Sequence, residues 1–246
     1  MRRFAQWTAQ TPMAKSIFLA GATGVIGRRL VPLLIGAGHP VTGSTRSPEK
    51  AESLRALGVR PALVDAYDAP ALIDAVKAAA PDVVIHQLTD LALMHAPGRR
   101  DEALARNARL RREVTPNLVA AALMAGARRV IAQSIAFVYA PGPEPHGEGD
   151  PLDLAAEFGR AVAALEREVT STPGLEGVVL RYGLFYGPGT GADGPQMHTA
   201  VHVDAAAQAA LLAVERGAPG IYNIADDTGA VAIGKARAEL GFDPAF

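Results

Sequence analysis

The sequence predicts an α/β protein built on a doubly wound parallel sheet. Short runs of β-branched and aliphatic residues alternate with longer helical patterns, which is typical of βαβ units. The first such run, residues 16–20, leads into a glycine-rich turn and then into an amphipathic stretch at 25–37. With 246 residues, of which 49% are hydrophobic, the chain is long enough to bury the core of one large domain.

The remaining elements follow in the same alternation of strand and helix. The longest helix contains Pro116, which is expected to kink it because the proline ring removes a backbone donor. Beyond residue 187 the pattern is less regular and predicts a helix near 204–216, a short strand at 221–224 and a last helix before Phe246. Further strands are expected at 39–45, 59–65, 83–86, 129–133 and 177–182, and further helices at 48–57, 70–80, 101–125 and 154–170.

The composition excludes several classes of protein. The formal net charge is −1, so the charge balance does not favour a nucleic acid or a membrane as partner. There is no cysteine, which excludes disulfides and thiolate catalysis. No apolar run approaches the ~20 residues of a membrane span. Residues 1–14 carry charge without an apolar centre, so we expect a flexible N-terminal extension, a single domain over 15–246 and a cytoplasmic location.

The glycine-rich turn reads Gly21-Ala-Thr-Gly24-Val-Ile-Gly27. Between a strand and a helix, Gly21 allows the tight turn, Gly24 lets the backbone approach a pyrophosphate, and Gly27 lets helix and strand pack closely. The N-terminus of the helix offers unpaired N–H groups and a partial positive charge to phosphate. The turn therefore predicts a dinucleotide site in a Rossmann fold, with contacts from Gly21, Thr23, Gly24, Val25, Ile26 and Gly27.

The end of the second strand distinguishes the two nicotinamide dinucleotides. An NAD site has an acidic residue about 20 residues after the loop, where it binds the ribose hydroxyls. This chain has Thr45 and Arg46 there, and an arginine can pair with the 2′-phosphate of NADP. The sequence therefore favours NADP(H) over NAD(H). The alternative is that Arg46 is an ordinary surface residue at a strand end, in which case NAD(H) remains open.

A resemblance to a known family rests on these motifs taken together. The segments GATGVIGRRL, STRSPEK, LVDAYD, RRVIAQSIAFVYAPG and VVLRYGLFYGPGTG, in this order, resemble the short-chain dehydrogenase/reductase superfamily. The most similar part of it is the extended or atypical branch, which is NAD-dependent epimerase/dehydratase-like. The resemblance implies a small C-terminal substrate lobe, here reduced, to which residues 184–202 and 219–246 contribute, and it is compatible with a homodimer.

The resemblance also implies individual contacts. Asp65 resembles the acid that binds the adenine amino group, and Ser134 lies where the fifth strand meets the nicotinamide. The other positions implied for the cofactor are Gln87, Leu88, Thr89, Asn107, Tyr182 and Gly183. The wall of a pocket for a small-molecule substrate is expected at Arg181, Tyr186, His198 and His202.

The chain departs from the family at its usual chemistry, which uses a Tyr and a Lys four residues apart on one helix. The best register places Phe158 and Val162 at these two positions, and neither can transfer a proton. No tyrosine of the chain is followed by a lysine four residues later. Alternative proton donors are Ser134, Tyr139 and His86, with His95 among the weaker candidates.

Three functions remain open from the sequence. The leading prediction is an NADP(H)-linked enzyme of the atypical short-chain dehydrogenase type, acting on a small organic substrate with an unusual proton donor. A non-catalytic dinucleotide-binding protein, such as a redox sensor, and a non-redox isomerase or dehydratase are the alternatives. No metal site is expected, because His198 and His202 have the spacing of a zinc helix without its glutamate.

Overall fold

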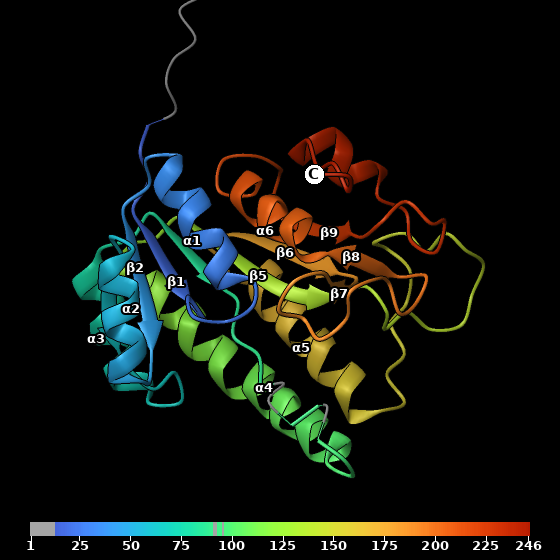
Figure 1. The fold of residues 1–246 in the computed structure, drawn as a ribbon, viewed down its shortest axis with the longest axis horizontal. Helices are drawn as coiled ribbons and strands as arrows, with labels where there is room; N and C mark the ends of the chain where they lie inside the picture. The colour runs from blue at the N-terminus through green and yellow to red at the C-terminus, as the bar shows by residue number, and fades with distance from the viewer. Residues whose placement is uncertain (1–12, 91–92, 95) are drawn as a thin grey trace, which may run out of the picture.

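The computed structural model describes residues 13–90, 93–94 and 96–246, and its centre is a seven-stranded sheet (Figure 1). All neighbouring strands of this sheet run parallel. The strand order, β3-β2-β1-β4-β5-β6-β9, confirms the predicted doubly wound sheet. The strands are β1 (Ile17–Ala20), β2 (Val41–Thr45), β3 (Arg60–Leu63), β4 (Val83–His86), β5 (Arg129–Ile135), β6 (Glu176–Tyr182) and β9 (Gly220–Ile224).

Helices cover both faces of the sheet, as Figure 1 shows, with α1 and α6 on one face and α3, α4 and α5 on the other. The hydrophobic core is divided in the same way, into one cluster under α1 and α6 and another under α3, α4 and α5. Because both faces are covered, the inner strands are apolar throughout rather than alternating. The helices are α1 (Gly27–Gly36), α2 (Pro48–Ala56), α3 (Ala69–Ala79), α4 (Arg100–Ala125), α5 (Glu157–Ser171), α6 (Val203–Leu212) and a π-helix (Ala236–Leu240).

Local sequence explains where the helices beside the site begin. Ser47 precedes α2, and its hydroxyl accepts a hydrogen bond from the backbone N–H of Lys50, while Pro48 occupies the first helical position. Asp68 caps α3 in the same way. Each cap stops the preceding strand and sends the chain back along the sheet, so that both loops lie at the carboxyl ends of the strands.

The structure differs from the sequence-based expectation mainly after residue 183. Strands β7 (Leu184–Tyr186) and β8 (Ala200–His202) form a second, two-stranded parallel sheet that the sequence analysis missed. Within the segment 219–246 that was expected to join the substrate lobe, β9 lies in the main sheet beside β6. Helix α4 continues through Pro116. Of the helices that the structure describes, none has the length and apolar character needed to span a membrane.

Candidate functional site

The glycine turn between β1 and α1 is so tightly packed that two of its glycines cannot be replaced without displacing backbone. Gly21 has φ +92°, and a Cβ atom there would lie 2.7 Å from the carbonyl oxygen of Gln87. A Cβ atom on Gly27 would lie 2.2 Å from the carbonyl oxygen of Gly21. A Cβ atom on Gly24 would lie 3.3 Å from the carbonyl oxygen of Gly21, and Gly24 is exposed. Gly21 and Gly27 therefore hold the turn together, while Gly24 presents its open side to the space outside it.

This open side faces a cavity of about 440 Å³ at the carboxyl ends of β1 to β4. The cavity has room for a nucleotide-sized ligand, and it lies where open α/β sheets bind their ligands. Predicted cofactor residues that line it are Gly21, Thr23, Gly24, Thr45, Arg46, Asp65, Gln87, Leu88 and Thr89. Further residues of the lining are Ser44, Ser47, Lys50, Val64, Ala66, Tyr67, Asp90, Leu110 and Val114.

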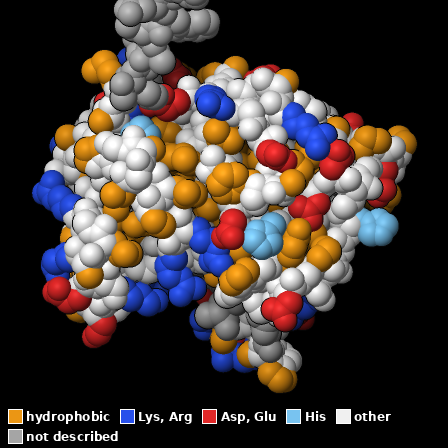
Figure 2. Space-filling view, turned by 45° about the horizontal axis from the view of Figure 1, so that its top comes forward, with side chains coloured by type: hydrophobic (Ala, Val, Ile, Leu, Met, Phe, Trp, Pro, Cys, Tyr) orange, Lys and Arg blue, Asp and Glu red, His pale blue; other side chains and the backbone are white. Residues whose placement is uncertain are grey.

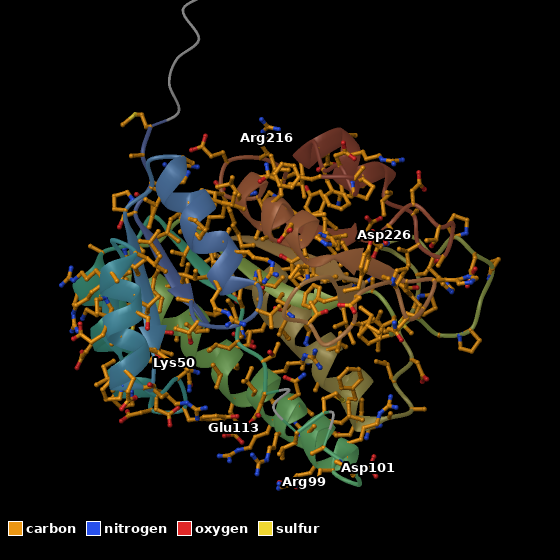
Figure 3. The ribbon with its side chains drawn as sticks, viewed as in Figure 1. Lys50, Arg99, Asp101, Glu113, Arg216 and Asp226 are labelled. Atoms are coloured by element: carbon orange, nitrogen blue, oxygen red, sulfur yellow. The ribbon has the colours of Figure 1, made fainter. Side chains whose placement is uncertain are left out.

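One end of the cavity is basic. Strand β2 is followed there by the exposed side chain of Arg46, and Lys50 joins it from the first turn of α2. In Figure 3 Lys50 lies between α2 and α4. Figure 2 shows Lys and Arg side chains gathered beside a notch in the lower outline of this face. The two cations and the hydroxyl of Ser44 are donors suited to a phosphate group, whereas the hydroxyl of Ser47 already donates to Glu49.

His86, one of the three proposed proton donors, is the last residue of β4 and is buried. The backbone N–H of Leu88 donates to its Nδ1 atom at 3.2 Å, so the proton is on Nε2, which lies 3.2 Å from the hydroxyl of Thr115. Burial, assisted by the positive charge of Arg111, lowers the pKa of His86 to about 4. Both ring nitrogens have protein partners, and the geometry supports a neutral structural histidine.

Ser134 also has a buried partner. It is fully buried, and its hydroxyl donates to Oε1 of Glu166 at 2.7 Å. Arg181, at the neighbouring position of β6, binds both oxygens of the same carboxylate, Nε to Oε1 at 2.8 Å and Nη2 to Oε2 at 2.6 Å. These three side chains form one closed polar network between the sheet and α5. The hydroxyl of Ser134 and the Nε and Nη2 groups of Arg181 are therefore already bound to Glu166.

Tyr139, the third proposed donor, extends this network. Its hydroxyl accepts from Nη1 of Arg181 at 2.8 Å and donates to Oδ1 of Asn223 at 2.6 Å. Its ring is stacked on His146, with centroids 4.9 Å apart. Burial raises the pKa of Tyr139. Because the hydroxyl both donates and accepts a hydrogen bond within the protein, the geometry indicates that Tyr139 is a structural link between β6, β9 and the 140–151 loop.

Phe158 and Val162, the two α5 residues that the resemblance aligns with the usual Tyr and Lys, are packed as hydrophobic residues. Val162 is fully buried in a cluster with Ile135 and Val138, and Phe158 packs against the same cluster. The ring of Phe158 lies below the guanidinium of Arg111, whose Cζ is 4.8 Å from the ring centroid. The observed packing thus leaves no proton-transferring side chain at these positions.

The two-stranded sheet carries the remaining candidates for a substrate pocket. Tyr186 and His202 are half-buried and meet edge to face, with centroids 5.2 Å apart. Burial raises the pKa of the carboxyl of Asp226, which Figure 3 labels, and the neighbouring Tyr186 hydroxyl acts against this rise. Nδ1 of His202 accepts from the backbone N–H of Asp204 and so begins α6. His198 is exposed, and its backbone carbonyl accepts a hydrogen bond from the hydroxyl of Thr228.

Several predicted residues lie outside the cavity lining. Val25 and Ile26 pack into the core, and Gly183 contacts the backbone of Ala200 behind β6. Asn107 accepts a hydrogen bond from the backbone of Asp90, and Tyr182 is buried beside Gln87. His95 falls outside the described residues. In the described part of the chain, no cluster of His, Asp and Glu could hold a metal ion.

Known proteins resemble this chain in sequence and in fold. A family model described as NAD dependent epimerase/dehydratase family matches residues 17–225. A Streptomyces protein, 3-diazoavenalumate denitrifying reductase, is 44% identical over 239 residues, which cover 86% of this chain and 76% of the relative. UDP-glucose 4-epimerase of Thermotoga maritima superposes with a TM-score of 0.76 at 19% identity, over 93% of each chain. The Bordetella bronchiseptica enzyme WbmG, in complex with NAD and UDP, superposes with a TM-score of 0.75 at 18% identity, over 96% of this chain and 91% of that enzyme. The chain therefore belongs to the NAD dependent epimerase/dehydratase family.

Proposed function

We propose that the chain is an NADP(H)-linked reductase that replaces the diazo group of an aromatic substrate with hydrogen. The observation that carries the cofactor assignment is the basic end of the cavity, where Arg46 and Lys50 follow β2. An NAD site has a carboxylate at this position for the ribose hydroxyls, whereas cations and hydroxyls suit a 2′-phosphate. The substrate class comes from the Streptomyces relative, whose name describes a denitrifying reductase of a diazo compound.

This reaction class agrees with the absence of the Tyr and Lys pair. When bound, NADPH would supply a hydride to the ring carbon that bears the diazonium group, whose C–N bond breaks as its electron pair leaves with dinitrogen. The products are the arene, dinitrogen and NADP⁺, and the balance requires no proton. An apolar wall of Phe158 and Val162 is compatible with such a step, because no group has to protonate an oxygen.

The protein's own residues would bind and position the reactants. The turn from Gly21 to Gly27 would bring a pyrophosphate to the N-terminus of α1, while the N–H of Gly24 itself donates to the carbonyl oxygen of Gly21 at 3.0 Å. Arg46 and Lys50 would hold the 2′-phosphate. Isotope transfer tests the proposal: the protein is incubated with a benzenediazonium salt and NADPH carrying deuterium in either the 4R or the 4S position. We expect deuterium in the arene from one of the two labels.

Transfer of deuterium from only one of the two labelled cofactors distinguishes the enzymatic reaction from direct reduction of the salt by NADPH. The direct reduction has no stereochemical preference. The control is the double variant R46A/K50A, which should transfer little deuterium at low NADPH concentration. Equal transfer from both labels, at the rate seen without protein, would exclude the proposed reaction.

A non-catalytic dinucleotide-binding protein is the second candidate, favoured by the apolar residues Phe158 and Val162. That function predicts tight NADPH binding together with no stereospecific transfer.

A further inference from the structure

Helix α4 has a polar stripe on its buried side. Asn107, Arg111 and Thr115 are spaced four residues apart, so they lie on one face of the helix, and all three are buried. Oδ1 of Asn107 accepts from the backbone N–H of Asp90 at 3.1 Å, and Thr115 binds His86. For Nη1 of Arg111, which is also buried, no hydrogen-bond partner exists among the described residues. The stripe therefore contains an unsatisfied cationic donor between two satisfied polar groups.

The position of Arg111 follows from its neighbours. Thr115 binds the last residue of β4, and α4 runs back along the sheet from the carboxyl ends of the strands. Arg111, one turn earlier than Thr115, lies closer to that edge of the sheet. Leu110 and Val114, on the adjacent face of α4, line the cavity. Arg111 itself is not one of the residues that line the cavity, and its guanidinium lies over the ring of Phe158 on α5.

The charges around Arg111 do not balance. Burial lowers the pKa of Arg111 to about 10, and Glu166 is the acidic group that acts against this. Both oxygens of Glu166, however, are bound by the buried guanidinium of Arg181, and Ser134 binds one of them as well. Two buried arginines therefore share one carboxylate, and an extra positive charge remains with Arg111. Buried charges are ordinarily paired, so a buried charge without a partner of its own is a candidate binding residue.

We propose that Arg111 is a substrate-binding residue whose guanidinium holds a carboxylate of the aromatic substrate. A guanidinium presents paired N–H donors that match the two oxygens of a carboxylate, and the buried, unsatisfied Nη1 provides the donor. The name of the Streptomyces relative describes its substrate as such an anion, 3-diazoavenalumate. The reaction in which the carboxylate would be used rests on the proposed function, but carboxylate binding by Arg111 does not.

Binding of unreactive probes tests this inference. The protein, saturated with NADP⁺, is titrated calorimetrically with cinnamate and with its uncharged counterpart cinnamamide. We expect cinnamate to bind R111M at least tenfold more weakly than it binds the original protein. The affinity of R111K for cinnamate should lie between those of R111M and the original protein. Cinnamamide should bind equally to all three. The control R112M removes the next arginine of the same helix, which is half exposed and pairs with Glu157, and should leave cinnamate binding unchanged.

A stability measurement separates this role from a structural one. If Arg111 only supports the fold, R111M lowers the melting temperature; if its charge is held for a ligand, the melting temperature stays the same or rises, because an unpaired buried charge is removed. Cinnamate binding that is equal in R111M and the original protein, or absent in the original protein while NADP⁺ binds, would overturn the inference. Arg111-dependent cinnamate binding without reduction of diazonium salts would instead overturn the proposed function alone.

Discussion

Glu166 and Arg181 face each other inside the protein, joined by hydrogen bonds of 2.8 Å and 2.6 Å, with side chains 5% and 3% exposed. The pair links α5 to strand β6, and the hydroxyl of Ser134 binds the same carboxylate from β5. Because this carboxylate balances Arg181, it is not available as the partner of Arg111. The pair therefore explains why an excess positive charge remains with Arg111.

Replacing Glu166 by Gln should destabilise the protein strongly. The substitution keeps the shape of the side chain but leaves two buried guanidinium groups without a carboxylate. Breaking a buried ion pair by removing one partner costs about 3–5 kcal/mol. Urea denaturation measures the free energy of unfolding. The matched control is E113Q, since Glu113 is half exposed and pairs with Arg109 on the surface of α4, and it should leave the midpoint unchanged. An E166Q midpoint equal to that of the original protein would contradict the prediction.

Acidification should destabilise the protein through His86. Burial lowers the folded-state pKa of His86 from 6.5 to about 4, so between these values the unfolded chain binds a proton that the folded protein does not. The contribution to stability is complete above pH 6.5 and is lost as the pH falls toward 4. It amounts to roughly 3 kcal/mol. H86Q removes the titrating group, and the difference between the stability profiles of the two proteins from pH 4 to 7.5 isolates it. Parallel profiles would show that His86 does not titrate in this range.

The basic end of the cavity should determine the preference for NADPH. In R46A and in K50A we expect the dissociation constant of NADPH to rise at least ~10-fold, because each loses a charge-assisted contact with the 2′-phosphate. NADH, which lacks that phosphate, should bind within about twofold as before. Fluorescence titration of both nucleotides measures the effect. R55A, an exposed arginine on α2 that pairs with Glu52, is the control and should change neither constant. Equal weakening of NADPH and NADH would contradict the 2′-phosphate assignment.

The parallel strands and the glycine turn could be predicted because local signals determine them. Buried parallel strands are continuous apolar runs, and a turn with Gly21 and Gly27 follows from backbone approach alone. Lys50 was also accessible to sequence reasoning, because Ser47 and Pro48 place the first turn of α2 directly after Arg46. The short sheet of β7 and β8 could not be predicted, since three-residue strands carry too little pattern.

Other parts of the site depend on contacts between distant segments. Nothing in the sequence around Ser134 or Tyr139 indicates that Glu166, Arg181 and Asn223 occupy their hydroxyl groups. Leu110 and Val114 line the cavity because of the rotation of α4 about its axis, which packing against α3 and α5 sets. Arg111 escaped notice for the same reason, since an arginine among the many of α4 reads as a solvated helix charge until its burial is known.

The stability of variants at Val162 should depend on whether the new side chain is positively or negatively charged, because Arg111 carries an unbalanced positive charge. Val162 is fully buried on α5, one turn from Phe158, whose ring lies under the guanidinium. V162K and V162E both add a larger, charged side chain there, so the cost of overpacking is similar in the two. V162K adds a second cation beside an unbalanced one, whereas V162E offers Arg111 a carboxylate. We expect V162E to be more stable than V162K by at least ~2 kcal/mol. In the R111M background this difference should shrink or reverse, and a difference that persists there would show that Arg111 is not its cause.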